Sequence, residues 1–427
     1  MKKFVYIILI FTFNNHVFGQ SVDHPELYSQ TKPYVFKVKT SQNANSSKAS
    51  YGTGFVVDKD GLLITNYHVI STIIQDKFNR YKIFVVDKEN SFEAKVIDFS
   101  VINDLALIKI NRKFKDSMKL ERELPKRGEK IFSIGLPKDL NMSIVEGTFN
   151  GELKRGLYER FLMSTPVNSG MSGGPSVDNN GNVIGINVSI LRDSENISFS
   201  VPSEKALELL NYFHKNGAAL KRKDYDRHIE KQLKNIEKSL LKSMKTNLSK
   251  SKVVGGFEIA APSKDVKCWT ANDKSRKNTF KFYKQSCRLK SSAFIQRRLY
   301  SGTYKLSYTA LHNIKRNKLQ FSSIIKSYLN SNSLKPNDHN LQTFREELTK
   351  YSCDEDIWVN DNNISFKVTY CLSTYLRYKN IYRLFFKAAT INNKNKGLVV
   401  KLSADGFTKN GIFDFIKYHL NNIKSVN

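Results

Sequence analysis

Three polar residues that lie far apart in the chain, His68, Asp104 and Ser172, have the side-chain types of a proton-transfer set. A serine hydroxyl is a poor nucleophile until a neutral imidazole accepts its proton. The imidazole in turn needs a carboxylate that holds its tautomer and stabilises its charged form. Each residue alone is common in purely structural roles, but the order and local sequence of all three favour nucleophilic chemistry at Ser172.

The segment NSGMSGGP, residues 168–175, places Ser172 in a glycine-rich bend. Because glycine has no Cβ, successive backbone N–H groups in such a bend can turn toward one point. Amide groups arranged in this way stabilise the negative oxygen of a tetrahedral intermediate. The bend therefore predicts an oxyanion hole beside a serine nucleophile.

Short strands must position these residues, because residues 34–201 alternate apolar and polar side chains in brief runs separated by turns. The segments DKDG (58–61) and NNGN (179–182) are typical of hairpin turns. So many short strands predict an all-β sandwich or barrels. The expected strands lie within residues 34–40, 52–66, 81–86, 92–99, 104–110 and 182–190.

Six segments in a fixed order resemble the trypsin-like serine proteases of the HtrA (Deg) type, over about residues 30–215: GTGFVV, TNYHV, DFSVINDLALIKI, IGLP, NSGMSGGP and FSVPS. The resemblance implies an all-β double β-barrel of the chymotrypsin-like kind, and hydrolysis of peptide bonds through an acyl-enzyme. It also implies that His68 is the general base, Asp104 its orienting carboxylate and Ser172 the nucleophile. The N–H groups of Gly170 and Ser172 would form the oxyanion hole.

Met171 departs from the family pattern, which has asparagine at this position or, in digestive relatives, an aspartate that pairs with a newly cut N-terminus. Methionine cannot form that ion pair, so activation by N-terminal pairing is not expected. We expect the Met171 side chain to point beneath the bend and pack against apolar neighbours, because a flexible thioether fills irregular space.

The specificity pocket is expected to lie beside the bend. Pro166 stands six residues before Ser172, where trypsin has an acidic residue, so no carboxylate is present to bind Arg or Lys. The candidate walls, Val167, Asn168 and the segment Ile197–Ser198, predict a preference for small or medium apolar side chains.

The N-terminal sequence MKKFVYIILIFTFNNHVFGQ has two lysines followed by an apolar run from Phe4 to Phe13. That run is too short to cross a bilayer comfortably, so residues 1–19 predict a secretory signal peptide rather than a membrane anchor. The protein is therefore expected to be exported, to the periplasm or beyond the cell.

Charge divides the chain into two unlike parts. Residues 211–427 carry 42 basic and 16 acidic side chains, so they hold +26 of the formal net charge of +30. The nearly neutral part is expected to form a protease domain over residues 20–216. Its last helix is predicted at residues 203–216, with Ser203 as the N-cap and Gly217 as the stop signal.

A charged helical linker is predicted over residues 217–255. Within it, Ile229, Leu233, Ile236 and Leu240 recur at spacings of 4, 3 and 4 residues and form one apolar helical stripe. Three interpretations stay open for this stripe: a helix packed on its own protein, a short coiled coil for oligomerisation, or a membrane-surface helix.

Residues 256–427 are predicted to form a basic α+β region, interpreted as two similar units at about 256–335 and 340–427. Each unit runs from Cys and Trp through a turn and a strand to a second Cys, and continues with a strand pair and a helix. The strand pairs are expected within 304–313 and 318–324, and within 382–390 and 397–403; the helices are expected at 322–330 and 411–423.

An even number of cysteines in an exported chain predicts two disulfide bonds. The repeat pairs Cys268 with Cys287 and Cys353 with Cys371. The intervals of 18 and 17 residues inside the pairs lack the CxxC-type spacing of a zinc site, so zinc is the weaker alternative. No metal or cofactor is expected.

The intact set of His68, Asp104 and Ser172, with the family resemblance, favours a serine endopeptidase that acts on proteins or peptides, with the basic region for surface tethering or substrate recruitment. The alternative is a binding or chaperone-like protein with a weak or inactive protease scaffold. Lys and Arg interleaved with Tyr and Phe suit anionic envelope or membrane surfaces, and they also suit single-stranded nucleic acid. Export makes nucleic acid the less natural partner, and the oligomeric state stays open.

Overall fold

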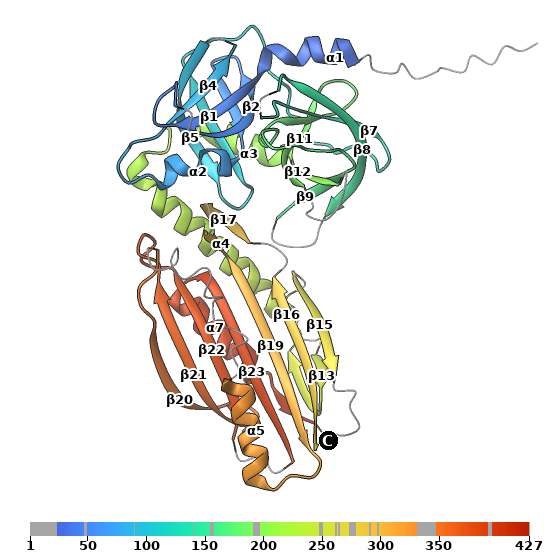
Figure 1. The fold of residues 1–427 in the computed structure, drawn as a ribbon, viewed down its shortest axis with the longest axis vertical. Helices are drawn as coiled ribbons and strands as arrows, with labels where there is room; N and C mark the ends of the chain where they lie inside the picture. The colour runs from blue at the N-terminus through green and yellow to red at the C-terminus, as the bar shows by residue number, and fades with distance from the viewer. Residues whose placement is uncertain are drawn as a thin grey trace, which may run out of the picture.

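The structure is a computed structural model, and its N-terminal half forms two closed antiparallel barrels (Figure 1). The predicted signal peptide at residues 1–19 lies outside the described residues. The structure describes residues 24–426 except 47–48, 89, 139, 154–157, 191–196, 247–250, 261–262, 264, 273–278, 290–291, 297–298, 331–346 and 392–394.

Each barrel has six strands, and together they confirm the predicted double β-barrel. Every strand expected in residues 34–110 and at 182–190 is present. The first barrel consists of β1 (Val35–Ser41), β2 (Ser50–Asp58), β3 (Leu62–Thr65), β4 (Lys82–Asp87), β5 (Asn90–Ser100) and β6 (Leu105–Ile110). The second consists of β7 (Lys130–Gly135), β8 (Ser143–Leu153), β9 (Arg160–Met163), β10 (Pro175–Val177), β11 (Val183–Ile190) and β12 (Ser198–Pro202).

Three helices and a 3₁₀ turn accompany the barrels: α1 (His24–Thr31), η1 (Lys32–Tyr34), α2 (Tyr67–Gln75) and α3 (Ser203–Asn216). The helix predicted at 203–216 is confirmed, and Gly217 ends it in the left-handed conformation with φ of 66°. The N-cap prediction is wrong: Pro202 occupies the cap position, and the Ser203 hydroxyl donates instead to the carbonyl of Glu121.

The C-terminal half is built on one seven-stranded antiparallel sheet with the order β15-β16-β19-β23-β22-β21-β20. Disulfide bonds Cys268–Cys287 and Cys353–Cys371 are present, which confirms both predicted pairs. They join β15 to β16 at one edge and β20 to β21 at the other. The strands are β15 (Val266–Asn272), β16 (Phe280–Leu289), β19 (Thr303–Asn313), β20 (Ser352–Val359), β21 (Ser365–Thr374), β22 (Tyr382–Thr390) and β23 (Lys396–Phe407).

The two expected units contribute to this single sheet and meet where β19 pairs with β23. One strand prediction is wrong, because residues 318–324 begin the helix α5 (Lys318–Asn330). Asn317 starts this helix: its side-chain oxygen accepts from the Gln320 N–H at 2.9 Å. Phe321 and Ile325 are buried at helical spacing, which explains why a strand is not formed.

Successive side chains of the central strands point to opposite faces of the sheet, and both faces are apolar. In β19, Leu311 packs with α5, whereas Tyr308 belongs to the cluster on the opposite face. That opposite face is covered by α7 (Lys409–Asn421) and by α4 (Tyr225–Thr246), which follows the turn η2 (Arg222–Asp224). The C-terminal half also contains two smaller sheets. One has three strands, β13 (Ser251–Val254), β14 (Phe257–Ala260) and β24 (Lys424–Ser425), and the other is the hairpin of β17 (Ala293–Gln296) and β18 (Leu299–Ser301).

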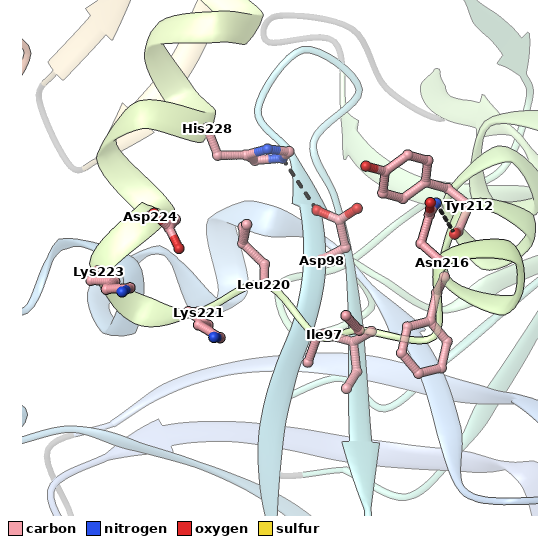
Figure 2. A pocket seen from close by; sticks show the side chains of 12 residues that line it. Ile97, Asp98, Tyr212, Asn216, Leu220, Lys221, Lys223, Asp224 and His228 are labelled. Carbon is pink, nitrogen blue, oxygen red and sulfur yellow. Dashed lines mark hydrogen bonds and ion pairs between the residues drawn. The ribbon is translucent and has the colours of Figure 1, made fainter.

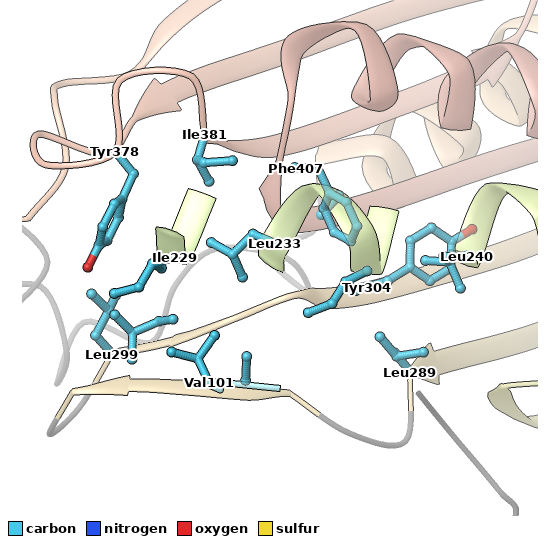
Figure 3. Packing of buried hydrophobic residues seen from close by; sticks show 14 of the residues in the cluster. Val101, Ile229, Leu233, Leu240, Leu289, Leu299, Tyr304, Tyr378, Ile381 and Phe407 are labelled. Atoms are coloured by element: carbon cyan, nitrogen blue, oxygen red, sulfur yellow. The ribbon is translucent and has the colours of Figure 1, made fainter. Parts of the chain in front are cut away.

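Helix α4 runs between the barrels and the C-terminal sheet (Figure 1). The predicted stripe is confirmed as buried, since Ile229, Leu233, Ile236 and Leu240 are each at most 2% exposed. These side chains share one cluster with Val101 of the first barrel and with residues of the C-terminal part, as Figure 3 shows. Of the three open interpretations, packing on the same protein is therefore correct. Among the described helices, none has the length and apolar character needed to cross a membrane.

Candidate active site

His68 and Asp104 lie together at the end of the first barrel. His68 is the second residue of α2, and Asp104 directly precedes β6. The His68 Nδ1 and Asp104 Oδ2 atoms are 2.7 Å apart, and the His68 backbone N–H donates to Asp104 Oδ1 at 2.9 Å. One carboxylate thus holds both the imidazole ring and the start of the helix that carries it. A hydrogen bond at Nδ1 leaves Nε2 free to face a nucleophile.

The backbone of Asp104 is in the left-handed region, with φ of 57°. Aspartate tolerates this conformation better than most residues. The arrangement is held by the Asp104 carbonyl, which accepts from the Tyr67 N–H at 3.1 Å and from Asn66 Nδ2 at 2.9 Å. The turn before β6 is therefore tied to the start of α2 through backbone and side chain alike.

The environment of His68 favours its protonated form. Burial alone would lower its pKa, but the charge of Asp104 and the hydrogen bond to it outweigh that effect and raise the pKa above the ordinary 6.5. The His68 side chain is 31% exposed and that of Asp104 is 14% exposed. The imidazole is thus accessible to a substrate while its carboxylate partner is largely shielded.

Ser172 lies in the bend between the two barrels. Its hydroxyl donates to the carbonyl of Val188 at 3.2 Å, and the described atoms of Ser172 and His68 form no hydrogen bond with each other. The Ser172 carbonyl accepts from the N–H of Thr53 at 2.8 Å, which links the bend to the first barrel.

Two amide groups in the bend are unpaired. In the described part of the chain, the N–H groups of Gly170 and Ser172 donate to no acceptor. Gly170 has φ of 99°, and a Cβ at this position would lie 2.7 Å from the carbonyl oxygen of Leu136. Only glycine fits such a site, and the unpaired amides are what an oxyanion hole requires.

Thr53 is a further residue of the site, and the sequence analysis missed it. Its hydroxyl donates to the Gly170 carbonyl at 2.7 Å and accepts from the Leu136 N–H at 2.9 Å. The first contact holds the peptide that follows Gly170, and the second ties Leu136 to the same hydroxyl. A threonine between two glycines in GTGFVV gives no sequence signal for this role, because its partner lies 117 positions away.

Met171 occupies the position that was predicted for it. It is fully buried and packs in a cluster with Phe149, Met163 and Val167. Its sulfur also accepts a long hydrogen bond, 3.4 Å, from the N–H of Asn168. Apolar packing therefore supports the bend from below, at the position where relatives with an aspartate use a charge.

The residues expected to line a specificity pocket differ in their surroundings. Pro166 and Asn168 are exposed, and Ile197 is half-buried. Val167 is buried in the cluster of Met171. Ser198 is buried, and its hydroxyl donates to the Thr165 carbonyl at 2.8 Å. The predicted preference for small apolar side chains stays a prediction.

A hollow of about 420 Å³ lies away from these residues, between β5, α3 and the start of α4 (Figure 2). It contains a second histidine–carboxylate pair, His228 and Asp98, with 3.2 Å between Nε2 and Oδ1. Among the described residues that line this hollow there is no serine, threonine or cysteine.

Known proteins provide independent comparisons. Residues 52–186 match the family model of the trypsin-like peptidase domain. The chain is 34% identical over 192 residues to Serine protease HTRA1 of Xenopus tropicalis, covering 42% of this chain and 40% of that protein. It is 29% identical over 206 residues to a probable periplasmic serine endoprotease, DegP-like, of Bartonella henselae, covering 45% and 38%. A solved structure of the HtrA-type protease AlgW with tripeptide has a TM-score of 0.39 and 26% identity, covering 46% of this chain and 65% of that one.

The chain thus spans about two fifths of the length of the curated relatives it matches. The match includes His68, Asp104 and Ser172 and most of both barrels. Residues 52–186 thus match the trypsin-like peptidase domain, and the N-terminal half of the chain is similar in sequence to HtrA-type serine proteases.

Proposed function

We propose that this protein is an exported serine endopeptidase that hydrolyses proteins or peptides through an acyl-enzyme. One observation carries the proposal: His68 is held by Asp104 at 2.7 Å, beside a serine bend whose Gly170 and Ser172 amides are unpaired among the described residues. Similarity to HtrA-type proteases supports the same chemistry.

In the first half of the proposed reaction, the Ser172 hydroxyl leaves the Val188 carbonyl and turns to Nε2 of His68. As Oγ attacks the carbonyl carbon of the substrate, His68 takes its proton. The negative charge of the tetrahedral oxygen is bound by the N–H groups of Gly170 and Ser172. Asp104 stabilises the imidazolium that forms and keeps the ring in place.

In the second half, the C–N bond breaks and His68 gives its proton to the leaving amine. A water molecule then takes the place of the amine, and His68 removes a proton from it during attack on the ester. The ester bond to Ser172 breaks, the acid product leaves and Oγ regains its proton. The residues named here perform every proton transfer, so no cofactor is needed.

Export and tethering complete the proposal. Residues 1–19 are proposed as a signal peptide that is removed, and the basic C-terminal half as a contact for anionic envelope surfaces or acidic substrates. The net charge of +26 on residues 211–427 supports this, because such a field attracts polyanions over about a Debye length, roughly 8 Å at physiological salt. Binding to vesicles that contain anionic lipid, lost in high salt, would be the matching measurement.

Labelling with a fluorophosphonate tests the nucleophile. We expect the wild type to be labelled, and Ser172→Ala and His68→Ala not to be. Ser169→Ala is the matched control, because Ser169 is an exposed serine in the same bend and should keep its labelling. Labelling is repeated with unfolded protein or peptide present, since a substrate can shift a resting bend into its active form.

The outcomes separate two classes of protein. Labelling of Ser172→Ala, or loss of labelling in Ser169→Ala alone, contradicts the assignment of Ser172. No labelling of the folded wild type, with or without substrate, favours the alternative of a binding or chaperone-like protein on an inactive protease scaffold.

A further inference from the structure

The hairpin of β17 and β18, which belongs to the C-terminal half, lies against the helix that carries His68. The Tyr67 hydroxyl donates to the Ile295 carbonyl at 2.8 Å, and Tyr67 is fully buried. The ring of Phe294 meets the imidazole of His68 edge-on, with centroids 6.3 Å apart and an interplanar angle of 86°. A residue of the appended half thus packs directly on the proposed catalytic base.

The C-terminal half also binds the other end of α2, through Arg377. Arg377 donates from Nη1 to the Gln75 carbonyl and from Nη2 to the Ile74 carbonyl, both at 2.8 Å. Its side chain is only 12% exposed and also pairs with Asp226 at 2.6 Å. A cation on the last carbonyls of a helix satisfies unpaired acceptors and the negative end of the helix dipole. The hairpin is therefore part of a fixed interface.

A cavity of about 930 Å³ opens between the two halves at this point. From the protease side it is lined by His68, Ser50 and Thr72, among others. From the C-terminal half it is lined by Phe294, Gln296, Tyr300 and Glu347. The proposed base and the appended hairpin face one cavity, and neither half forms it alone.

We propose that this cavity is a substrate-binding subsite, and that the C-terminal half supplies its specificity-determining wall. The inference rests on the proposed function. Its occupant is the segment of the substrate polypeptide that follows the scissile bond. His68 must protonate the leaving amine, so the chain that carries this amine passes the imidazole, and the imidazole borders the cavity.

The wall selects for aromatic or large apolar side chains. Phe294 and Tyr300 form an edge-to-face pair with centroids 5.5 Å apart, and Tyr300 is 49% exposed without an occupant. Aromatic faces of this kind bury apolar side chains and give geometric preference to other rings. Glu347 is engaged by Gln296 Nε2 at 2.7 Å, so its carboxylate helps to hold the wall in place.

Two kinds of substrate with the same acyl part, three compounds in all, separate the role of this subsite from that of the catalytic residues. One is a quenched fluorescent peptide with phenylalanine directly after the scissile bond, and its partner peptide has serine there. The second kind is a simple amide that releases ammonia, so it has no residue after the bond. The enzyme variants are Tyr300→Ala and the control Tyr212→Ala, since Tyr212 is an exposed tyrosine on α3, outside this cavity.

We expect Tyr300→Ala to lower kcat/KM for the phenylalanine peptide about tenfold and to remove its advantage over the serine peptide. Hydrolysis of the simple amide should change less than about twofold, because its leaving group, ammonia, has no side chain to place against the aromatic wall. Tyr212→Ala should leave all three rates unchanged. Phe294→Leu, which keeps an apolar body beside His68, should reduce the preference for phenylalanine without abolishing amide hydrolysis.

The inference is overturned if Tyr300→Ala lowers the rates of peptide and amide equally, because the residue would then act through His68. It is also overturned if an active wild type shows no difference between the phenylalanine and serine peptides. A wild type that cleaves none of the three substrates contradicts the proposed function itself, and the subsite falls with it. Matching thermal unfolding midpoints of wild type and Tyr300→Ala confirm that the variant is folded.

Discussion

The hydroxyl of Thr53 donates to the carbonyl of Gly170 at 2.7 Å and so ties the oxyanion bend of the second barrel to a strand of the first. The same hydroxyl accepts from the Leu136 N–H at 2.9 Å. Because the Gly170 carbonyl is held on one side of the bend, the unpaired amides can face the other. Two barrels that pack together thereby fix the direction of a few N–H bonds.

Thr53→Val should lower kcat by about 10- to 100-fold with little change in KM, because amide groups aimed at the oxyanion act mainly in the transition state. Thr53→Ser keeps the hydroxyl and is the control, with expected activity close to the wild type. Steady-state kinetics on a short peptide amide measure both. An unchanged kcat in Thr53→Val would show that the bend keeps its shape without this contact.

Met171→Asp should nearly abolish activity and destabilise the protein. The side chain at this position is fully buried among apolar residues, and an uncompensated buried charge costs about 3–5 kcal/mol. Met171→Leu conserves volume and should cost less than about 1.5 kcal/mol. Denaturant unfolding and active-site titration report the two effects. Near-normal activity of Met171→Asp would contradict the inference that apolar packing supports the bend.

The pH dependence of kcat/KM should follow His68. Only the neutral imidazole can accept the proton of Ser172, so activity rises with pH through the pKa of His68. Because Asp104 raises that pKa, the midpoint should lie above 6.5. Asp104→Asn should move the midpoint down and lower kcat by about 10⁴-fold. A wild-type midpoint below 6.5 would contradict the described pair.

His228 should make stability pH-dependent through its contact with Asp98 (Figure 2). Burial alone would lower its pKa, but the hydrogen bonds to Asp98 and the Phe99 carbonyl outweigh this and raise it above 6.5. Below pH 6.5 His228 is protonated in both the folded and unfolded states, and its contact with Asp98 stabilises the folded protein fully. It is lost as the pH rises through the raised folded-state pKa.

The comparison of wild type with His228→Gln isolates this effect. The free energy of unfolding should differ more between the two proteins at pH 5.5 than at pH 8.5, measured in urea. His214→Gln is the control, since His214 is half exposed and its contact with Asp58, 3.4 Å, should contribute little. An equal difference at both pH values would mean that folding does not shift the pKa of His228, which would contradict the described pair.

Much of the protease domain could be predicted because its signals are local. Alternation of side chains marked the strands, and the bend around Ser172 combined several glycines in one short segment. The positions of Met171 and of both disulfide bonds followed from similar local patterns. The role assigned to Ser203 failed because its hydroxyl contacts Glu121, 82 positions away.

The contacts of Thr53, Phe294 and Arg377 could not be predicted, since each depends on how separately formed elements meet. Phe294 lies more than 220 positions after His68, and no spacing rule connects them. The sequence after Asn317 predicts a strand over residues 318–324 because Phe321 and its neighbours fit the two-residue period of a strand as well as the 3.6-residue period of a helix. Only the packing of α5 on the sheet decides between the two structures.

The burial of α4 means that both halves of the chain should unfold in one step. The apolar stripe of α4 lies in one buried cluster with Val101 of the first barrel and Tyr304 of the sheet. Separating the two halves would therefore expose this shared apolar core to water. Each buried aliphatic side chain contributes about 1.5–3 kcal/mol. A polyanion that binds only the folded sheet would then raise the melting temperature of the distant barrels as well. A polyanion bound at the sheet would thus stabilise barrels that it does not contact.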